Sequence, residues 1–460
     1  MYLYQYRTFT NLNMYVCILL QIKTKDMKRE LYSSLLEWKN RETRKPLMLQ
    51  GARQVGKTFL VKQFAQQEYA QFIYLNFEQD DELKEIFNKS LNPEKLLRDI
   101  EFLYGKKIKE FSTLIFFDEI QASEQALKSL KYFYEDTPGY HIIAAGSLLG
   151  VAINKTRSFP VGKVTFLDMY PMSFNEYLIA FNEELLEEHL RNMKPGDSLS
   201  EVIHEKVLTH FKLYLFLGGM PEVLQNYLSK RNIITARKIQ YDIIEAYEND
   251  FSKYTTRTQT MKNMEVWASI PTQLAKENKK FKYSDVKNKA RASSYELSID
   301  WLKRAGLVNV AYNITTPKLP LAGYADLAKF KLYLLDTGLL GAMLKLSSDI
   351  IIKPNKLFTE YNGAFIENYV AMELSKIDKK ELFYWTSRGE AEVDFIIQDQ
   401  KNIYPVEVKS GTSKNLKSLR SYEQKYKPKL IFRSSPRNYF MQDEFVNIPL
   451  YAVYSVYNFV

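Results

Sequence analysis

The stretch Leu-Met-Leu-Gln-Gly-Ala-Arg-Gln-Val-Gly-Lys-Thr, residues 47–58, contains the spacing G-x-x-x-x-G-K-T. The apolar run Leu47–Leu49 predicts a buried strand before the loop, and Phe59–Gln67 predicts a helix after it. In this strand–loop–helix context, Gly51 and Gly56 let backbone N–H groups turn inward around a phosphate. The N-terminus of the following helix adds partial positive charge at the same place.

This loop predicts a site for ATP and Mg²⁺. We expect Lys57 to reach the β- and γ-phosphates and Thr58 to ligate Mg²⁺. The expected nucleotide-binding residues are those of the whole loop, namely Gly51, Ala52, Arg53, Gln54, Val55, Gly56, Lys57 and Thr58.

A second stretch, Thr113–Gln121, supplies two acids at the end of an apolar run. Leu114–Phe117 predicts a buried parallel strand, and Asp118 and Glu119 follow it. Ligands bind at the carboxyl ends of strands in open α/β sheets. We therefore expect Asp118 to hold Mg²⁺ through water and Glu119 to orient and polarise the attacking water.

Two further residues complete the predicted catalytic set of Lys57, Glu119, Ser147 and Arg157. Ser147 follows the predicted strand Tyr140–Ala145, where a polar residue can sense the γ-phosphate, although serine is also an ordinary turn residue. Arg157 lies on the loop that leaves this strand. It is expected to act as an arginine finger, in cis or on a neighbouring subunit, with a solvated loop cation as the alternative.

The order of these three motifs resembles that of AAA-superfamily ATPases with a P-loop domain of the AAA_14 type. The stretches Tyr170–Tyr177, Phe216–Pro221 and Trp301–Val308 resemble motifs of the bacterial and archaeal ATPase family with a C-terminal DUF4143 domain. The resemblance runs from about residue 28 to the C-terminus. It implies an α/β fold in which a P-loop NTPase parallel sheet is followed by a helical lid, a winged helix and a restriction-endonuclease-like α/β domain.

The domain boundaries follow from changes in sequence character. A nine-residue apolar run, Met14–Ile22, is too short to span a bilayer, and Met27 is a possible true start. We expect a possible N-terminal extension at 1–26, an ATPase core at 27–170, a helical lid at 171–270, a winged-helix-like domain at 271–336 and a DUF4143 domain at 337–460.

The winged-helix-like region is predicted to contain two helices and two strands. One helix begins at the capping residue Ser284, and the second, Ala292–Ala305, places Leu297 on its apolar face. The strands are Leu307–Ile314 and Phe330–Leu335. Five basic side chains could lie against DNA phosphates, unless the module only packs against protein: Lys287, Lys289, Arg291, Lys303 and Arg304.

Near the C-terminus, two predicted strands form a hairpin around the turn Asp399–Asn402. If the hairpin is symmetric, Asp394 lies opposite Glu407, within reach of a cross-strand contact. Glu407 and Lys409 are two residues apart and share one face of their strand. Burying these charges is unfavourable unless they pair or bind a cation.

This constellation resembles the PD-(D/E)xK nuclease core, although Val393 replaces the familiar proline before Asp394. The resemblance implies three metal ligands, Glu367, Asp394 and Glu407, assisted by Lys409 and Gln424. Two alternatives are a charge network that only holds a binding domain together and a nuclease fold that has lost activity.

The overall composition restricts which binding partners and which cellular compartment we expect. A net charge of +10 favours an anionic partner, with DNA first, although a generally lysine-rich proteome would give the same charge. The single cysteine, Cys17, excludes a disulfide framework, and the four histidines show no metal-binding spacing; His204 and His210 are expected on a helix surface. We expect a cytoplasmic protein without a membrane partner.

The sequence thus predicts an ATP-hydrolysing protein that couples nucleotide state to a DNA-handling, nuclease-like domain. The alternative is a nucleotide-controlled switch or scaffold that acts on a protein partner. The oligomeric state does not follow from the sequence.

Overall fold

The computed structural model describes residues 27–153, 162–193, 196–253, 255–346, 362–377, 381–387, 389, 391–411 and 416–460. The expected extension 1–26 and the expected arginine finger Arg157 lie outside these residues.

The N-terminal part contains a parallel five-stranded sheet in the order β2-β3-β4-β1-β5. The strand of the G-x-x-x-x-G-K-T loop, β1, lies between β4 and β5, and β4 separates it from the acidic strand β3. The three predicted motifs therefore meet at one edge of the sheet. The strands are β1 (Leu47–Gln50), β2 (Gln71–Asn76), β3 (Thr113–Asp118), β4 (His141–Ala145) and β5 (Thr165–Asp168).

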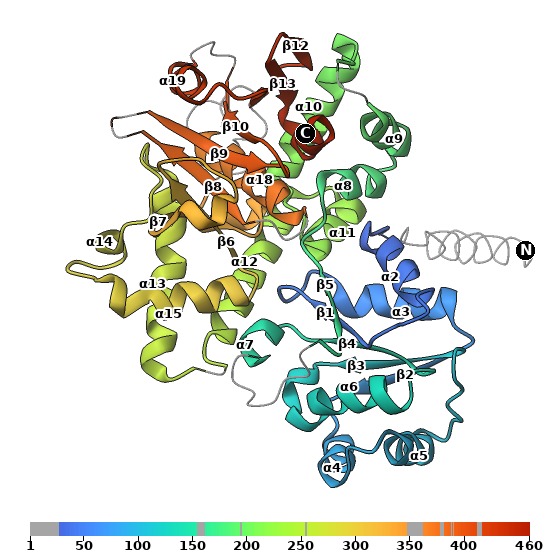
Figure 1. Cartoon of the computed structure of the whole chain (residues 1–460). Helices are drawn as coiled ribbons and strands as arrows, with labels where there is room; N and C mark the ends of the chain where they lie inside the picture. The colour runs from blue at the N-terminus through green and yellow to red at the C-terminus, as the bar shows by residue number, and fades with distance from the viewer. Residues whose placement is uncertain are drawn as a thin grey trace, which may run out of the picture.

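Helices cover both faces of this sheet (Figure 1). Leu114 and Phe116 of β3 pack toward the side of α2 and α3, and Ile115 and Phe117 pack toward α4, α5 and α6. All four side chains are buried, as expected for a parallel strand covered on both sides. These helices are α2 (Leu31–Lys39), α3 (Lys57–Glu68), α4 (Asp81–Lys89), α5 (Pro93–Tyr104) and α6 (Glu124–Asp136), and a short 3-10 turn, η1 (Ile120–Ala122), precedes α6.

A mostly helical region follows the sheet, as predicted. Ser173 caps α8 in a reciprocal capping box with Glu176. Between α10 and α11 the chain turns at Gly218 and Gly219, where Gly218 has a φ of +73° and a Cβ on Gly219 would collide with the Met172 carbonyl. The helices of this region are α8 (Phe174–Ala180), α9 (Glu184–Asn192), α10 (Glu201–Leu217), α11 (Pro221–Lys230), α12 (Ile233–Asp250) and α13 (Arg257–Leu274). The short α7 (Leu149–Ile153) lies earlier in the chain, between β4 and β5.

Residues 257–334 form three helices and an antiparallel hairpin of β6 and β7. The helix expected to start at Ser284 is a single turn, and Leu297, expected to be buried, is 71% exposed. The long α13 packs against both α15 and β7, so it belongs with this group rather than with the lid alone. The elements are α14 (Tyr283–Val286), α15 (Ala292–Arg304), β6 (Val308–Ile314), the 3-10 turn η2 (Leu321–Tyr324) and β7 (Ala325–Leu334).

The two strands expected in the winged-helix-like domain are part of the C-terminal sheet. Its eight strands run in the order β12-β13-β11-β10-β9-β8-β6-β7, and β6 pairs in parallel with β8. The open edge of β6 carries unpaired backbone groups that β8 satisfies. The expected domain boundary at 336/337 therefore separates strands that belong to one sheet. The added strands are β8 (Leu382–Thr386), β9 (Glu392–Gln398), β10 (Ile403–Val408), β11 (Ile431–Ser435), β12 (Phe440–Gln442) and β13 (Phe445–Pro449).

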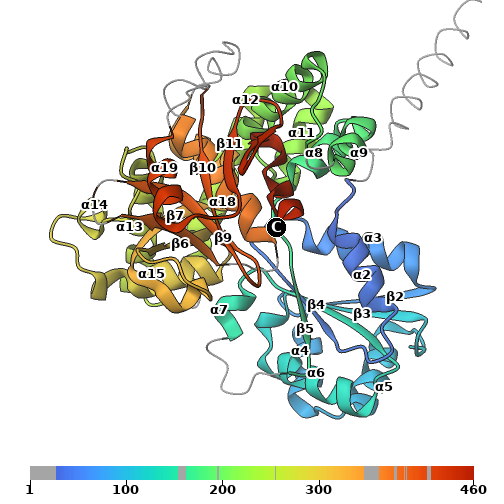
Figure 2. The same cartoon turned by 45° about the horizontal axis from the view of Figure 1, so that its top comes forward.

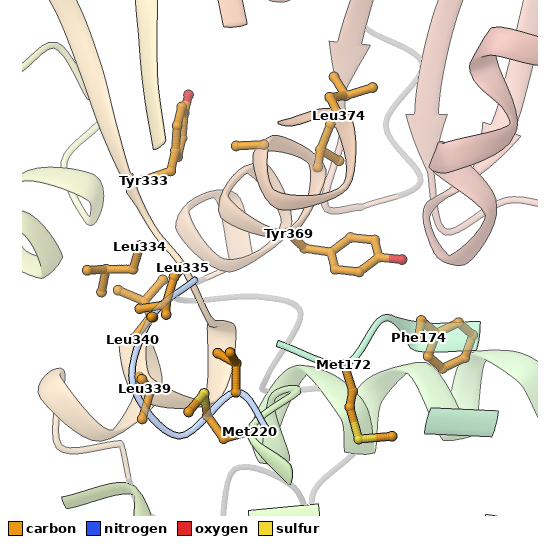
Figure 3. Close-up of a cluster of buried hydrophobic side chains, with 14 of the residues drawn as sticks. Met172, Phe174, Met220, Tyr333, Leu334, Leu335, Leu339, Leu340, Tyr369 and Leu374 are labelled. Carbon is orange, nitrogen blue, oxygen red and sulfur yellow. The ribbon is translucent and has the colours of Figure 1, made fainter. Parts of the chain in front are cut away.

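A continuous apolar core joins the helical region to this sheet (Figure 3). Met220 from the helical region lies near Leu339 of α16, and Met172 and the α18 residue Tyr369 belong to the same cluster. His204, expected on a helix surface, is buried, and its ring bonds to the Tyr451 hydroxyl and the Pro436 carbonyl. The remaining elements are α16 (Thr337–Met343), α18 (Asn362–Lys376), α19 (Lys417–Tyr426) and η3 (Leu450–Phe459).

The two views in Figures 1 and 2 show the five-stranded domain at one end and the eight-stranded sheet at the other, with the helical region beside both. Throughout the described ranges, no helix has both the length and the apolar character needed to cross a membrane.

Candidate functional site

Asp118, at the end of β3, meets the loop threonine directly. The Thr58 hydroxyl donates to one Asp118 carboxylate oxygen at 3.0 Å, and the Tyr74 hydroxyl donates to the same oxygen at 3.0 Å. Burial raises the pKa of Asp118 above its usual value, which these hydrogen bonds partly oppose. Hydroxyl and carboxylate oxygens are the ligands that Mg²⁺ prefers, so Thr58 and Asp118 fit this ion.

Lys57 is buried beneath its own loop. Its ammonium group donates to the carbonyls of Gly51 at 3.0 Å and Ala52 at 2.8 Å. Burial lowers the pKa of Lys57 to about 8, although Glu119 and Asp118 act in the opposite direction. A bound phosphate would give this ammonium group a negatively charged partner in place of the neutral carbonyls.

The loop conformation explains its glycines. Gly56 has a φ of +98°, and Gly51 has a φ of +147°. A Cβ on Gly51 would also collide with the Met169 carbonyl. Both positions therefore require glycine, as the sequence pattern predicted.

Glu119 occupies a left-handed backbone conformation, with a φ of +49°, at the turn after β3. Its carboxylate accepts a short hydrogen bond from the Gln121 side-chain amide and a bond of 3.5 Å from the Ser147 hydroxyl. Ser147 thus lies beside the predicted catalytic carboxylate. Gln121 was not predicted, and its position two residues after Glu119 is the signal that could have identified it.

Lys57, Thr58, Glu119 and Ser147 line one cavity of about 370 Å³. The cavity extends from the loop to the start of α11, which supplies Pro221, Glu222 and Gln225. It is large enough for a small-molecule ligand. The other lining residues are Met27, Arg29, Arg53, Gln54, Gly56, Phe59 and Met172.

Arg29, just before α2, holds the nucleotide loop through hydrogen bonds. The sequence did not predict this role. Its guanidinium donates to the Val55 carbonyl at 2.7 Å, to the Tyr170 carbonyl at 2.6 Å and to Glu176 at 3.0 Å. The side chains of Arg29 and Glu176 are only 6% and 5% exposed. Arg29 therefore joins Glu176 of α8 to Val55 of the nucleotide loop.

Arg53 links the loop to the helical region. Its guanidinium donates to Asp250, the last residue of α12, at 2.7 Å, and the Tyr247 hydroxyl donates to the Arg53 carbonyl at 2.8 Å. A shift of the loop would therefore act directly on α12.

We expect nucleotide binding at pH 9 to take up a proton. Above pH 8 the Lys57 amine is increasingly neutral in the free protein, and a triphosphate beside it favours the charged form. Titration calorimetry in buffers of different ionisation enthalpy measures this uptake, which should disappear near pH 6.5 and in Lys57→Met. Equal heats in all buffers at pH 9 would show that Lys57 is already charged.

The C-terminal hairpin has the predicted register. Val406 pairs with Phe395 and Ile403 with Gln398, which continues to Asp394 opposite Glu407. The Val408 amide donates to the Asp394 carboxylate at 2.8 Å, and the Lys409 ammonium lies 2.5 Å from Glu407.

Glu367 is held by cations rather than left open for a metal. Its carboxylate contacts Lys279, lies 2.9 Å from the Lys331 ammonium and accepts a bond of 2.5 Å from the Tyr333 hydroxyl. Burial alone would raise the pKa of Glu367, but the two lysines outweigh it and lower the pKa to about 2. Burial, Glu367 and Glu407 raise the pKa of Asp394 to about 8.

The expected metal site is not formed by these side chains. Among the described residues, no group of three or more His, Cys, Asp or Glu side chains could hold a metal ion. The reason is that Lys279 and Lys331 occupy the oxygens of Glu367. Gln424, expected to assist, is exposed on α19, whereas Leu419 and Tyr422 form the buried side of that helix.

Comparison with protein families matches three successive parts of the chain. Residues 43–178 match an AAA domain, residues 208–350 match a domain of unknown function (DUF8612), and residues 362–453 match a second one (DUF4143). None of the curated proteins compared with the chain matches it.

Three solved structures that match the chain are remote from it in sequence. A Walker-type ATPase of Pyrococcus abyssi is 15% identical over 70% of this chain and 97% of its own, with a TM-score of 0.45. The Orc1 protein of Aeropyrum pernix, solved with DNA, is 13% identical over 72% and 96%, with a TM-score of 0.29. Cdc6p of Pyrobaculum aerophilum is 10% identical over 70% and 92%, with a TM-score of 0.25.

Proposed function

Because this chain joins an AAA-type P-loop ATPase domain to a DUF4143 domain, we propose that it hydrolyses ATP and that its nucleotide state governs a DNA-handling C-terminal half. One observation carries the first part. Lys57, Thr58, Glu119 and Ser147 line a single cavity, and Asp118 lies 3.0 Å from Thr58 behind it.

Each of these residues has a defined task in the proposed reaction. Lys57 binds the β- and γ-phosphates, and Thr58 and Asp118 hold Mg²⁺, which neutralises charge on the phosphates when bound. Glu119 orients the attacking water and accepts its proton, while Gln121 and Ser147 fix the carboxylate of Glu119.

The route from the nucleotide to the C-terminal half runs through the turn after α15. Gly306 packs against the loop, since a Cβ there would lie 3.4 Å from the Ala52 nitrogen. Gly150 of α7 packs against the Arg304 carbonyl. This turn leads directly into β6, which is a strand of the eight-stranded sheet. A displacement of the loop would therefore reach that sheet through one strand.

The charge of the chain supports an anionic partner. The net charge is +10, and Lys289 and Arg291, just before α15, are exposed. Arg304, Lys287 and Lys303 have partners within the protein, namely Asp300, Glu265 and the ring of Tyr312. We therefore assign phosphate contact in this region to Lys289 and Arg291 rather than to all five predicted cations.

A second function, a nucleotide-controlled switch acting on a protein partner, is favoured by the lysines around Glu367. A carboxylate saturated by Lys279, Lys331 and Tyr333 suits a stable binding domain better than a metal-dependent nuclease. In that case the C-terminal domain binds without cleaving.

We expect DNA to change the rate of ATP turnover several-fold. The measurement is steady-state phosphate release with Mg²⁺, with and without single- and double-stranded DNA, at low and high salt. Lys57→Ala protein prepared in parallel provides the blank for contaminating ATPases. Turnover that DNA does not alter, at any salt concentration, would favour the protein-partner switch. No turnover above the blank under any of these conditions would contradict the ATPase assignment.

A further inference from the structure

A second cavity, of about 740 Å³, lies on the eight-stranded sheet between α19, β11 and the hairpin of β12 and β13. Figure 1 shows α19, β12 and β13 at the end of the molecule away from α5. Arg433 and Arg437 line it together with the aromatic side chains of Tyr439, Phe440 and Phe445. The ATPase cavity shares none of these residues.

Arg433 is a buried cation, and the described residues supply no anionic partner for it. Arg433 is only 5% exposed, and its Nε donates to the neutral Asn447 amide oxygen at 2.6 Å. Its guanidinium lies 5.1 Å from the centre of the Phe445 ring. Within the described part of the chain, no carboxylate forms an ion pair with it. Burial, and then Arg437, lower the pKa of Arg433, which agrees with an unneutralised charge.

Asn447 holds the base of this cavity in place. Its side chain is fully buried, and its oxygen also accepts from the Ser435 hydroxyl at 2.7 Å. Its amide nitrogen donates to the carbonyls of Arg437 at 3.2 Å and Asn438 at 2.9 Å. The backbone that carries both arginines is therefore ordered before any ligand binds, which lowers the entropic cost of binding.

The acidic side chains of the cavity lie at its rim. Glu423, Asp443 and Glu444 line it but are exposed, as is Arg420. Water can solvate these rim charges, whereas it cannot solvate Arg433 equally well. Arg433, at the base of the cavity, is thus the charge that a bound anion would neutralise.

The position of Arg433 connects this cavity with the candidate nuclease residues. In the parallel register of β11 with β10, the backbone of Arg433 lies opposite that of Glu407, whose carboxylate pairs with Lys409. Beside the arginines, Phe440 on the edge strand β12 is 52% exposed. An arginine pair with an exposed aromatic ring is the combination that binds the backbone and stacks the bases of single-stranded nucleic acid.

We propose that Arg433 and Arg437 bind a backbone phosphate of single-stranded nucleic acid, and that a base stacks on Phe440. This site rests on the proposed DNA-handling role and gives it a location and a substrate class. This site is also linked to the helical region. The Asn438 side chain, next to Arg437, forms hydrogen bonds of 3.2 and 2.7 Å with the Leu199 backbone.

The test is fluorescence anisotropy of a labelled single-stranded oligothymidylate with the full-length protein. Arg437→Gln, Arg433→Gln and Phe440→Ala should each weaken binding by roughly 10-fold, from lost phosphate or stacking contacts. The arginine variants should also show a smaller dependence on salt. The charge-matched control is Arg98→Gln, an exposed arginine on α5, which should bind like the parent. Phe440 is exposed, so its variant remains informative even if the loss of the buried Arg433 impairs folding.

ATP turnover measured on the same preparations separates this inference from the proposed function. Parent-like affinity in Arg437→Gln and Phe440→Ala would overturn the site while leaving ATP hydrolysis and DNA binding elsewhere intact. Failure of the parent protein to bind the oligonucleotide would overturn both the site and the DNA-handling role, but not the ATPase. Arg437-dependent capture of a labelled oligoglutamate peptide in place of the oligonucleotide would assign the cavity to an acidic protein partner and overturn the proposal.

Discussion

Glu119→Gln is expected to lower ATP turnover by roughly 10²- to 10⁴-fold, the usual contribution of a general base. The amide keeps the size of the side chain and an oxygen that can accept the hydrogen bond from Gln121. It cannot accept the proton of the attacking water. The backbone N–H groups of the loop, the Thr58 hydroxyl and the Lys57 ammonium, which we expect to bind the nucleotide, are unchanged, so the affinity for ATP should remain close to that of the parent.

Two measurements check this result. Steady-state phosphate release gives turnover, and equilibrium binding of a fluorescent ATP analogue gives affinity. The matched control is Glu124→Gln, which removes an exposed carboxylate that pairs with Lys128 on the surface of α6, and it should hydrolyse ATP normally. A Glu119→Gln protein with the parental turnover would show that another group activates the water.

Arg29→Met is expected to destabilise the protein by about 3–5 kcal/mol, because it leaves the Glu176 carboxylate buried without its cation. It also removes the hydrogen bond to the Val55 carbonyl of the nucleotide loop, so ATP affinity should fall together with stability. Glu176 still accepts from the Ser173 and Glu30 amides, which limits the loss.

Urea unfolding followed by fluorescence measures this effect, and a double-mutant cycle isolates it. Arg29→Met combined with Glu176→Gln should recover part of the lost stability, because the second change removes the unpaired charge. ATP affinity should not recover, because the contact with Val55 is still missing. The control is Lys206→Met, which breaks a surface pair with Glu183 and should leave the unfolding midpoint unchanged. Equal stability of Arg29→Met and the parent would contradict a structural role for this ion pair.

The local sequence pattern was sufficient to predict the nucleotide loop, the strand before it and the helix after it. A strand, a loop with two glycines and a helix are set by spacing within about 20 residues, because backbone geometry and side-chain period act over that distance. The same holds for the acidic strand and for the hairpin around Asp399–Asn402. There the period of two and the symmetry of the turn specify which residue lies opposite which.

The sequence by itself therefore determined the fold of the P-loop domain, the positions of Thr58, Asp118 and Glu119 at one sheet edge and the register of the C-terminal hairpin. Only the tertiary structure decided that β6 joins β8, that Arg29 pairs with Glu176 and that Lys279 and Lys331 surround Glu367. These partners are separated by between 36 and 147 positions along the chain. The physical reason is that such contacts are chosen by the burial of charges and the pairing of free strand edges between distant segments, which no local period encodes.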